Sequence, residues 1–534
     1  MGTETATATG AQLLVAGLEE AGVEVVFGLP GVHNLAAWEA LRESPIRLVG
    51  VRHEQAAAYA ADGYARVSGR LGVALVTTGP GAANTLGAVG EAWAGGAPVL
   101  VVATDIPAEL RRPGVYRGVL HECTDQRAMF TPVTKAQFSG PDPRAAIAAA
   151  LAHPRRPVYL EVATDALSAP ASPGDDPAAS APPAPHDLEV AVALLDRAQR
   201  PLVWAGGGAV RDDAGAAVAA LAERLCAPVF TSYQAAGLLG DDPLAVGLPT
   251  HLPATGALWD EADLVVAVGS DLDGVNTQNW RQPQPPALVA VNVDPADAAK
   301  NYRVDAVVHA GAAAGAQALA GAAAEHAPWA DLDAVRAHAR EWLEREAPRE
   351  MAFLAAFGRA LPPEAVVVCD MCIPGYWIGG FHRFTAPRRL VYPLGWGTLG
   401  AAFPQALGVS LSGAGPVVSV SGDGGFLFAC GELATMAQER LPFTAVIVDD
   451  GGYGMLRFDQ RRQERETYGV DLLAPDFVAL AQAFGVRAER VEGLTDAFAD
   501  ALARHLADPE PSVLVAGAAL QPPPTTSPRW YRPA

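Results

Sequence analysis

Short runs rich in β-branched residues alternate with alanine-rich helical patterns along this chain, and this alternation constrains the fold more than any other feature. In the N-terminal third, helical patterns separate the runs EVVFGLPG, IRLVGVRHE, LGVALVTTGPG and APVLVVAT. Strands that alternate with helices in this way form parallel, doubly wound sheets. The sequence therefore predicts an α/β fold.

The same alternation recurs twice more, after two breaks that mark domain boundaries. The segment LSAPASPGDDPAASAPPAPH, residues 167–186, contains six prolines and no hydrophobic period, which is typical of a linker. A charged helical stretch over 326–350 makes the second break. A chain of 534 residues is long enough for three domains. We expect three doubly wound domains, at residues 1–166, 187–325 and 351–534.

The amino-acid composition narrows the classes of partner and the cellular compartment that we expect for this protein. The net charge of −21 argues against nucleic acid and anionic membrane surfaces as partners. No apolar run reaches the ~20 residues of a membrane span, and MGTETATATG lacks the pattern of a signal peptide. The five cysteines are sparse and odd in number, which suits a reducing compartment. We expect a cytoplasmic protein that acts on a small molecule.

Two acidic motifs end neighbouring predicted strands of the third domain. The sequence predicts a strand over PVVSV, a helix over 426–440 and a strand over FTAVIV, so that Asp423 and Asp450 each follow a strand. The carboxyl ends of parallel strands meet at one edge, where ligands bind and two carboxylates can share a divalent cation. Three glycines would let backbone N–H groups approach an anion there: Gly422, Gly424 and Gly425. Either motif alone would favour an exposed turn, whereas both together predict a diphosphate held through Mg²⁺.

The pattern GDG, then 24 residues, then a polar pair followed by GGYGM, resembles the thiamine diphosphate motif of the acetolactate synthase and 2-oxo acid decarboxylase family. The resemblance implies metal ligation by Asp423, Asp450 and the carbonyl of Gly452, with Tyr453 and Met455 beside the cofactor. Where the family usually has Asn-Asn, this chain has Asp449-Asp450. The extra charge next to a diphosphate puts the metal affinity in question.

The segment VRHEQAAAYAADGYARVSG resembles the family's catalytic-glutamate helix. The resemblance implies that Glu54 exchanges a proton with the pyrimidine of the cofactor, which generates the nucleophilic C2 carbanion. By itself, Glu54 would be read as an acidic residue that the helix dipole favours.

Three glycine-rich segments resemble the family's pyrimidine-binding loops: FGLPG at 27–31, TTGPGAAN at 77–84 and GWGTLGAAFPQALG at 395–408. The last of these reads equally as an ordinary core helix with glycines. The resemblance brings five further residues to the cofactor: Leu29, Pro80, Asn84, Gly397 and Leu399. The Leu399 side chain would be the wedge that bends the cofactor.

Two histidines are the candidates for proton transfer to the substrate. His33 follows FGLPGV, where benzaldehyde lyase carries an active-site histidine, and His121 lies in GVLHECTDQRAM, which resembles the family's substrate-facing loop. A lone histidine is more often a satisfied surface or core residue. These stretches look most like the 5-guanidino-2-oxopentanoate decarboxylase branch. Against acetolactate synthase proper, Asp459 stands where that enzyme has a substrate-selecting tryptophan.

The middle domain carries AGGG at 205–208 but lacks the GxGxxG pattern with an acidic ribose partner. Where flavin-binding relatives have an Arg-Phe-Asp-Asp run, this chain has SDLDGVN. We therefore expect no functional FAD.

The leading hypothesis is a thiamine diphosphate- and Mg²⁺-dependent lyase or carboligase that decarboxylates a 2-oxo acid and then protonates or ligates the product. The alternatives are acetolactate synthase proper, benzaldehyde-lyase-like cleavage or formation of acyloins, and a catalytically silent thiamine diphosphate-binding protein. In this family the glutamate domain of one subunit faces the diphosphate domain of another. The resemblance thus implies a homodimer at least, and we favour a homotetramer.

Overall fold

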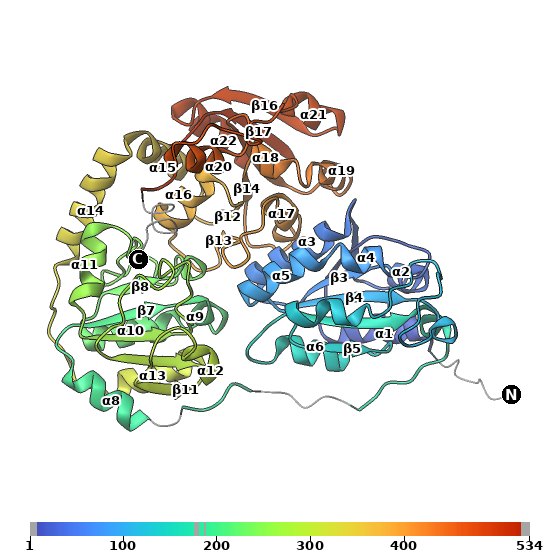
Figure 1. Ribbon diagram of the computed structural model, residues 1–534, viewed down its shortest axis with the longest axis horizontal. Coiled ribbons are helices and arrows are strands. Elements are labelled where there is room, and N and C mark those ends of the chain that lie inside the picture. The colour runs from blue at the N-terminus through green and yellow to red at the C-terminus, as the bar shows by residue number, and fades with distance from the viewer. Residues whose placement is uncertain (1–7, 176–180, 186–187, 525–534) are drawn as a thin grey trace.

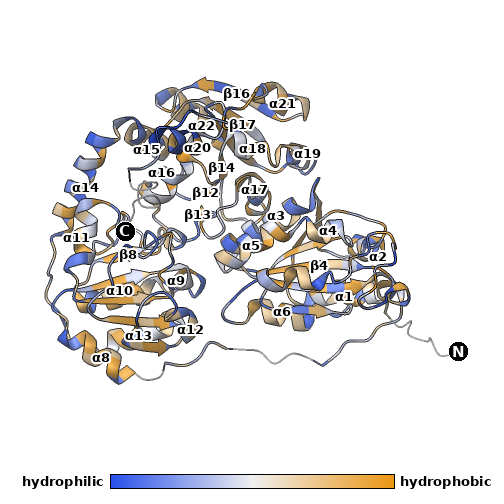
Figure 2. Ribbon diagram, viewed as in Figure 1, coloured by the Kyte–Doolittle hydropathy of each residue, from blue (hydrophilic) through white to orange (hydrophobic). Residues whose placement is uncertain are grey.

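The computed structural model describes residues 8–175, 181–185 and 188–524, which form three α/β units (Figure 1). Each unit contains one parallel sheet with helices on both faces, so the predicted fold class is confirmed. Strands such as β4 are hydrophobic, whereas α14 and α20 on the outside are largely hydrophilic (Figure 2). None of the helices in these described ranges is long and apolar enough to cross a membrane.

The N-terminal sheet has the strand order β2-β1-β3-β4-β6-β5. Its strands are β1 (Val25–Gly28), β2 (Arg47–Gly50), β3 (Gly72–Val76), β4 (Val99–Asp105), β5 (Gln137–Ser139) and β6 (Val158–Ala163). Its helices are α1 (Gly10–Glu20), α2 (Leu35–Arg42), α3 (Glu54–Ser68), α4 (Pro80–Ala83), α5 (Leu86–Gly95), α6 (Arg144–Leu151) and α7 (Thr164–Ser168). Central strands buried on both faces explain the continuous apolar runs in the sequence.

The middle sheet has the order β11-β10-β9-β7-β8. Its strands are β7 (Pro201–Ala205), β8 (Val229–Thr231), β9 (Leu264–Val268), β10 (Leu288–Asn292) and β11 (Ala306–His309). Its helices are α8 (Leu188–Arg197), α9 (Gly207–Arg211), α10 (Gly215–Leu225), α11 (Pro253–Glu261), α12 (Pro295–Ala298) and α13 (Ala312–Ala322). The chain then continues through α14 (Leu332–Glu346) and α15 (Pro348–Ala360) to the C-terminal sheet (Figure 1).

The C-terminal sheet has the order β13-β12-β14-β15-β17-β16. Its strands are β12 (Val366–Cys369), β13 (Leu390–Val391), β14 (Val417–Gly422), β15 (Phe443–Asp449), β16 (Arg487–Glu492) and β17 (Ser512–Gly517). Its helices are α16 (Ile373–Phe381), α17 (Ala402–Val409), α18 (Asp423–Phe426), α19 (Leu433–Gln438), α20 (Gly454–Arg462), α21 (Phe477–Ala483) and α22 (Asp496–Ala507).

The expected helix over 426–440 is wrong. Helix α18 ends at Phe426, and a 3₁₀ turn over Cys430–Glu432 precedes α19. The interruption turns the buried Glu432 carboxylate toward the N-terminal domain, where it accepts hydrogen bonds from the backbone N–H groups of Arg52 and His53. A contact between domains thus overrides the local helical pattern.

Helices α3 and α17 join the N-terminal and C-terminal domains through close backbone packing. A Cβ atom on Gly408 would overlap the carbonyl oxygen of Ala60, and one on Gly63 would overlap the carbonyl oxygen of Gln405. The two helices share one hydrophobic cluster. Their approach therefore depends on glycine at both crossing points.

A buried ionic network continues this interface. Arg66 Nε lies 2.8 Å from Asp62 Oδ1, and Arg66 Nη2 lies 3.3 Å from Glu91 Oε1. Gln405 of α17 donates a hydrogen bond of 2.7 Å to the Asp62 carboxylate. Both acidic side chains are fully buried, so Arg66 carries the positive charge that balances them.

Replacing Arg66 with alanine should lower the free energy of unfolding by ~3–5 kcal/mol, because two buried carboxylates lose their counter-charge. Urea unfolding followed by circular dichroism measures the change. Arg42→Ala on α2 is the matched control: Arg42 pairs with Glu39 and Glu43 at the surface, and its loss should cost under ~1 kcal/mol. Equal shifts for the two variants would show that the network contributes no more than surface pairs.

Candidate active site

The two acidic motifs lie together at the carboxyl edge of the C-terminal sheet. Strands β14 and β15 pair in parallel, with Gly422 opposite Val448, so Asp423 and Asp450 follow neighbouring strand ends. Both carboxylate oxygens of Asp423 and Oδ1 of Asp450 are buried without a hydrogen-bond partner among the described residues. Burial raises the pKa of Asp423 to about 6, and the charge of Asp450 adds to the shift.

Unpartnered, buried carboxylate oxygens fit a hard divalent cation, which would balance their charge and replace the missing hydrogen bonds. The two carboxylates cannot complete a metal shell alone, because the described residues contain no group of three or more His, Cys, Asp or Glu able to hold a metal. The Gly452 carbonyl and oxygen atoms of a ligand would have to supply the remaining positions. This donor set suits Mg²⁺ bound together with a diphosphate.

The side chains of Asp449 and Asp450 lie in different surroundings. Asp449 accepts a hydrogen bond of 2.8 Å from Arg490 Nη1 of β16. Asp450 Oδ1 lies 3.7 Å from Arg457 Nη1, and Arg457 also donates hydrogen bonds to the backbone carbonyls of Asp450 and Gly451. An arginine therefore offsets each carboxylate, which accounts for the extra charge that this chain carries.

The turn after β14 packs against two cofactor-loop candidates. A Cβ on Gly424 would come within 2.7 Å of the Tyr453 ring, and a Cβ on Gly425 would come within 3.3 Å of Leu399 Cδ1. Glycine is thus needed at positions 424 and 425, where Tyr453 and Leu399 approach the turn after β14. Gly397 has a φ of 68°, a left-handed conformation that glycine adopts without strain.

Two buried carboxylates that the sequence reasoning missed hold the 395–400 loop. Asp370 accepts hydrogen bonds from the N–H groups of Gly400 and Met371, and burial raises the pKa of Asp370 to about 7. Glu91 accepts from the hydroxyl of Thr398 at 3.0 Å and the N–H of Trp396 at 3.3 Å. Asp370 is far in sequence from Gly400, and Glu91 is far from Thr398, so no local pattern indicated these contacts.

Glu54 begins α3 and is 8% exposed. Its Oε2 accepts a hydrogen bond of 2.9 Å from Asn84 Nδ2, and a Cβ on Gly81 would lie only 3.3 Å from its Oε1. The structure thus brings Glu54 and Asn84 together, whereas Pro80 is exposed at the start of α4. Within the described ranges, no hydrogen bond or ion pair joins Glu54 to the C-terminal domain.

Two buried amide side chains, Asn34 and Gln126, shape the loops beside Glu54. Asn34 accepts from the N–H of Gly31 and donates to the carbonyl of Leu29. Gln126 accepts from the N–H of Gly79, whose φ is 63°, and donates to Thr104 and Tyr159. Sequence reasoning missed both residues, because an Asn or Gln in a loop carries no signal of its own.

His33 and His121 lie side by side on the N-terminal domain. Their ring centroids are 5.3 Å apart with perpendicular planes, and the Nδ1 atom of each is buried without a partner among the described residues. Burial, and then the nearness of His121, lower the pKa of His33. The carboxylate of Glu122 accepts hydrogen bonds from the N–H groups of Arg117 and Val119, so it stabilises its own loop.

A separate cavity of about 440 Å³ lies where the middle domain meets the other two domains. The SDLDGVN segment lines it, together with Gly207, Gly208, Arg211 and Trp396. Asp273 in this segment accepts hydrogen bonds from the N–H groups of Val275 and Asn276. The expected lack of FAD stays a prediction.

Three family models match this chain in order. They are the N-terminal thiamine pyrophosphate (TPP) binding domain of thiamine pyrophosphate enzymes at residues 8–129, the central domain at 188–319 and the C-terminal TPP binding domain at 372–516. The paired carboxylates therefore lie in the C-terminal binding domain, and Glu54 lies in the N-terminal one.

Curated relatives match over nearly the whole chain. A probable 2-ketoarginine decarboxylase of Pseudomonas aeruginosa is 36% identical over 92% of this chain and 90% of its own length. An acetolactate synthase of Bacillus subtilis is 31% identical over 92% of this chain and 90% of its own length. A probable acetolactate synthase large subunit of Methanocaldococcus jannaschii is 30% identical, over 90% and 87%.

The chain therefore belongs to the thiamine pyrophosphate enzyme family, as its motifs predicted. It is a thiamine diphosphate-dependent enzyme of the 2-oxo acid decarboxylase and acetolactate synthase type.

The variant Asp423→Ala should lose Mg²⁺-dependent binding of thiamine diphosphate, because the diphosphate would then meet the remaining carboxylate without a full metal site. Calorimetric titration of the cofactor with and without Mg²⁺ measures this loss. Asp449→Asn is the control, since Asp449 bonds to Arg490 and should leave the Mg²⁺ dependence intact. Equal cofactor affinity with and without Mg²⁺ in the unaltered protein would contradict the metal bridge.

Proposed function

We propose that this enzyme uses thiamine diphosphate and Mg²⁺ to decarboxylate a 2-oxo acid, and that it then protonates the product or ligates it to a second carbonyl compound. The observation that carries the proposal is the pair of neighbouring carboxylates, Asp423 and Asp450, in the C-terminal TPP binding domain, because three of their four oxygens are buried without a hydrogen-bond partner among the described residues. When bound, the cofactor supplies a nucleophilic carbon and an electron sink.

The residues of this chain would bind, orient and exchange protons. Asp423, Asp450 and the Gly452 carbonyl would hold Mg²⁺, while the N–H groups of Gly424 and Gly425 would face the diphosphate. Loop residues would position the pyrimidine, among them Leu29, Gly397 and Leu399. Glu54 would exchange a proton at the pyrimidine nitrogen, held in place by Asn84.

His33 and His121 would manage protons on the substrate. Both rings are partly exposed, so a bound acid or its product could reach them. The lowered pKa of His33 keeps its ring neutral at neutral pH, so this ring can accept a proton.

We infer that one active site needs two copies of this chain. Large apolar side chains are exposed on both domains that carry cofactor residues: Val32, Leu35 and Leu120 on the N-terminal domain, and Phe428, Leu456 and Leu473 on the C-terminal domain. A homodimer that places Glu54 of one subunit opposite Asp423 of the other would cover both surfaces. Two such dimers would form the homotetramer.

The acidic, cysteine-poor composition of the chain suits the cytoplasm.

Replacing Glu54 with glutamine should leave cofactor binding nearly unchanged yet slow C2–H exchange by ~10²–10⁴-fold, because the amide has no proton to exchange. Proton exchange into deuterated water, followed by NMR, measures this rate. An unchanged exchange rate would remove Glu54 from the mechanism.

Co-expression of the Glu54→Gln and Asp423→Ala chains tests the shared site. Random pairing leaves half of the dimers mixed, and each mixed dimer regains one intact site, so about a quarter of the original activity should return. Each variant expressed alone is the control and should be inactive. If the site were contained within one chain, the mixture would stay inactive.

A panel of 2-oxo acids tests the reaction. We expect CO₂ release to be fastest with 5-guanidino-2-oxopentanoate, because the sequence resembles that branch and the Pseudomonas relative carries that activity in its name. Assaying pyruvate, branched and aromatic acids in parallel, with analysis of aldehyde and hydroxyketone products, separates the alternatives. Faster turnover of pyruvate to acetolactate would favour acetolactate synthase, and no CO₂ from any acid would favour a silent binding protein.

A further inference from the structure

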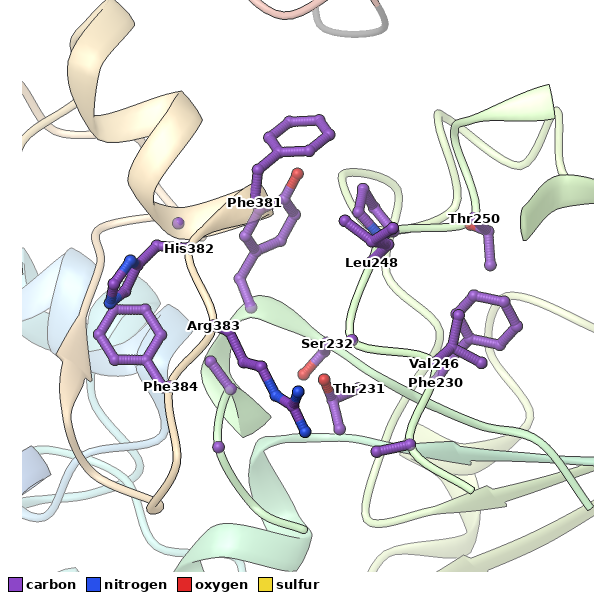
Figure 3. A pocket seen from close by; sticks show the side chains of 18 of the residues that line it. Phe230, Thr231, Ser232, Val246, Leu248, Thr250, Phe381, His382, Arg383 and Phe384 are labelled. Carbon is purple, nitrogen blue, oxygen red and sulfur yellow. The ribbon is translucent and has the colours of Figure 1, made fainter. Parts of the chain in front are cut away.

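A second cavity, of about 240 Å³, lies between the middle and C-terminal domains (Figure 3). The middle domain contributes β8 and the loop that follows it, and the C-terminal side contributes α14 and the chain at the end of α16. Figure 3 shows Phe381, His382, Arg383 and Phe384 on one wall and Thr231, Ser232 and Leu248 on the other. Glu54, Asp423 and Asp450 do not line this cavity, so it is separate from the proposed active site.

The charge of the cavity lining is opposite to that of the chain. Three arginines line it, Arg336, Arg340 and Arg383, and among the residues that the structure describes no aspartate or glutamate does. The whole chain carries a net charge of −21. Such a reversal of sign concentrates a positive potential in one hollow, which favours an anionic ligand.

The three arginines differ in how many hydrogen bonds and ion pairs they form within the protein. Arg336 donates hydrogen bonds to the carbonyls of Pro243 and Ala245 and pairs with Asp333. Arg383 forms one ion pair of 3.0 Å, with the exposed Asp241. Arg340 makes no ion pair or hydrogen bond with any residue in the described ranges. Arg340 and Arg383 can therefore turn toward a ligand at little cost.

The rest of the lining is mainly apolar and aromatic. Trp204, Phe230, Phe381 and Phe384 contribute rings, and Thr231 and Ser232 contribute hydroxyls. The cavity volume lies below the ~300–1,000 Å³ of sites for drug-sized ligands, so it suits a small ligand. Arginine forms paired hydrogen bonds with carboxylates, and aromatic rings suit an apolar body.

We propose that this cavity binds a small organic acid, with its carboxylate against Arg340 and Arg383 and its apolar body among the aromatic rings. Helix α16 connects this cavity to the cofactor edge of the sheet. It begins after Cys372, whose Cβ lies 3.5 Å from the Cβ position of Gly422, and it ends at Phe381 in the cavity wall. The ligand would thus be coupled to the cofactor site over the ~14 Å length of one helix. This coupling rests on the proposed function, whereas the binding site itself does not.

Titration of the cofactor-free protein with 4-methylpentanoate tests the binding site without involving the active site. Calorimetry should show one site per chain, and Arg340→Gln combined with Arg383→Gln should weaken binding by ~10-fold or more, because charge-assisted hydrogen bonds are lost. Both arginines are exposed, so these variants should fold. Arg345→Gln is the matched control: it lies on the same helix, pairs with Glu346 and does not line the cavity.

Two other probes define what would overturn the proposal. The uncharged 4-methylpentanamide should bind at least 10-fold more weakly than the acid, and inorganic phosphate should not compete with it. Equal binding of the amide, competition by phosphate, or unchanged affinity in the double variant would each overturn the carboxylate site.

The coupling has its own readout, the affinity for thiamine diphosphate and Mg²⁺ measured with and without saturating 4-methylpentanoate. Linkage requires that the acid and the cofactor change each other's affinity by the same factor, and the double variant should abolish that factor. Identical cofactor affinities in the unaltered protein would overturn the coupling while leaving the binding result in place.

Discussion

The burial of two like charges at one sheet edge is the constraint on which the active site depends. Removing the Asp423 and Asp450 carboxylates from water is costly unless a cation balances them, and the raised pKa values of both groups record that cost. The protein offers them no hydrogen-bond donor at three of their four oxygens among the described residues. A metal ion with a diphosphate would supply the missing charge and the missing ligands together.

The loops around this edge are held by residues far away in sequence. Asp370 and Glu91 accept hydrogen bonds from the 395–400 loop. Glu91 also belongs to the same buried network as Arg66. Arg66 lies on α3, whose first residue is Glu54. The helix that begins with Glu54 is therefore connected, through Arg66 and Glu91, to the loop that would hold a cofactor.

The sequence predicted what depends on local pattern. Alternating strands and helices predicted three parallel sheets, and the two acidic motifs predicted that Asp423 and Asp450 follow neighbouring strand ends. It did not predict the break in 426–440, because Glu432 is drawn to backbone N–H groups of another domain. The roles of Asp370 and Gln126 were missed for the same reason, because they depend on partners that only the folded chain brings near. The metal ligands and domain limits stay predictions.

The separation of Glu54 from the metal edge follows from how the two domains pack. Within one chain, the N-terminal domain uses α3 to contact α17, and Glu432 holds the backbone just before Glu54. The two domains are thus joined by contacts along the side of α3. The carboxylate of Glu54 instead accepts a hydrogen bond from Asn84. Exposed apolar side chains lie beside two of the predicted cofactor loops: Val32 and Leu35 follow the loop at 27–31, and Phe428 packs against Gly400. A second copy that covers those surfaces would bring the missing half of each site, so assembly and catalysis would depend on the same contacts.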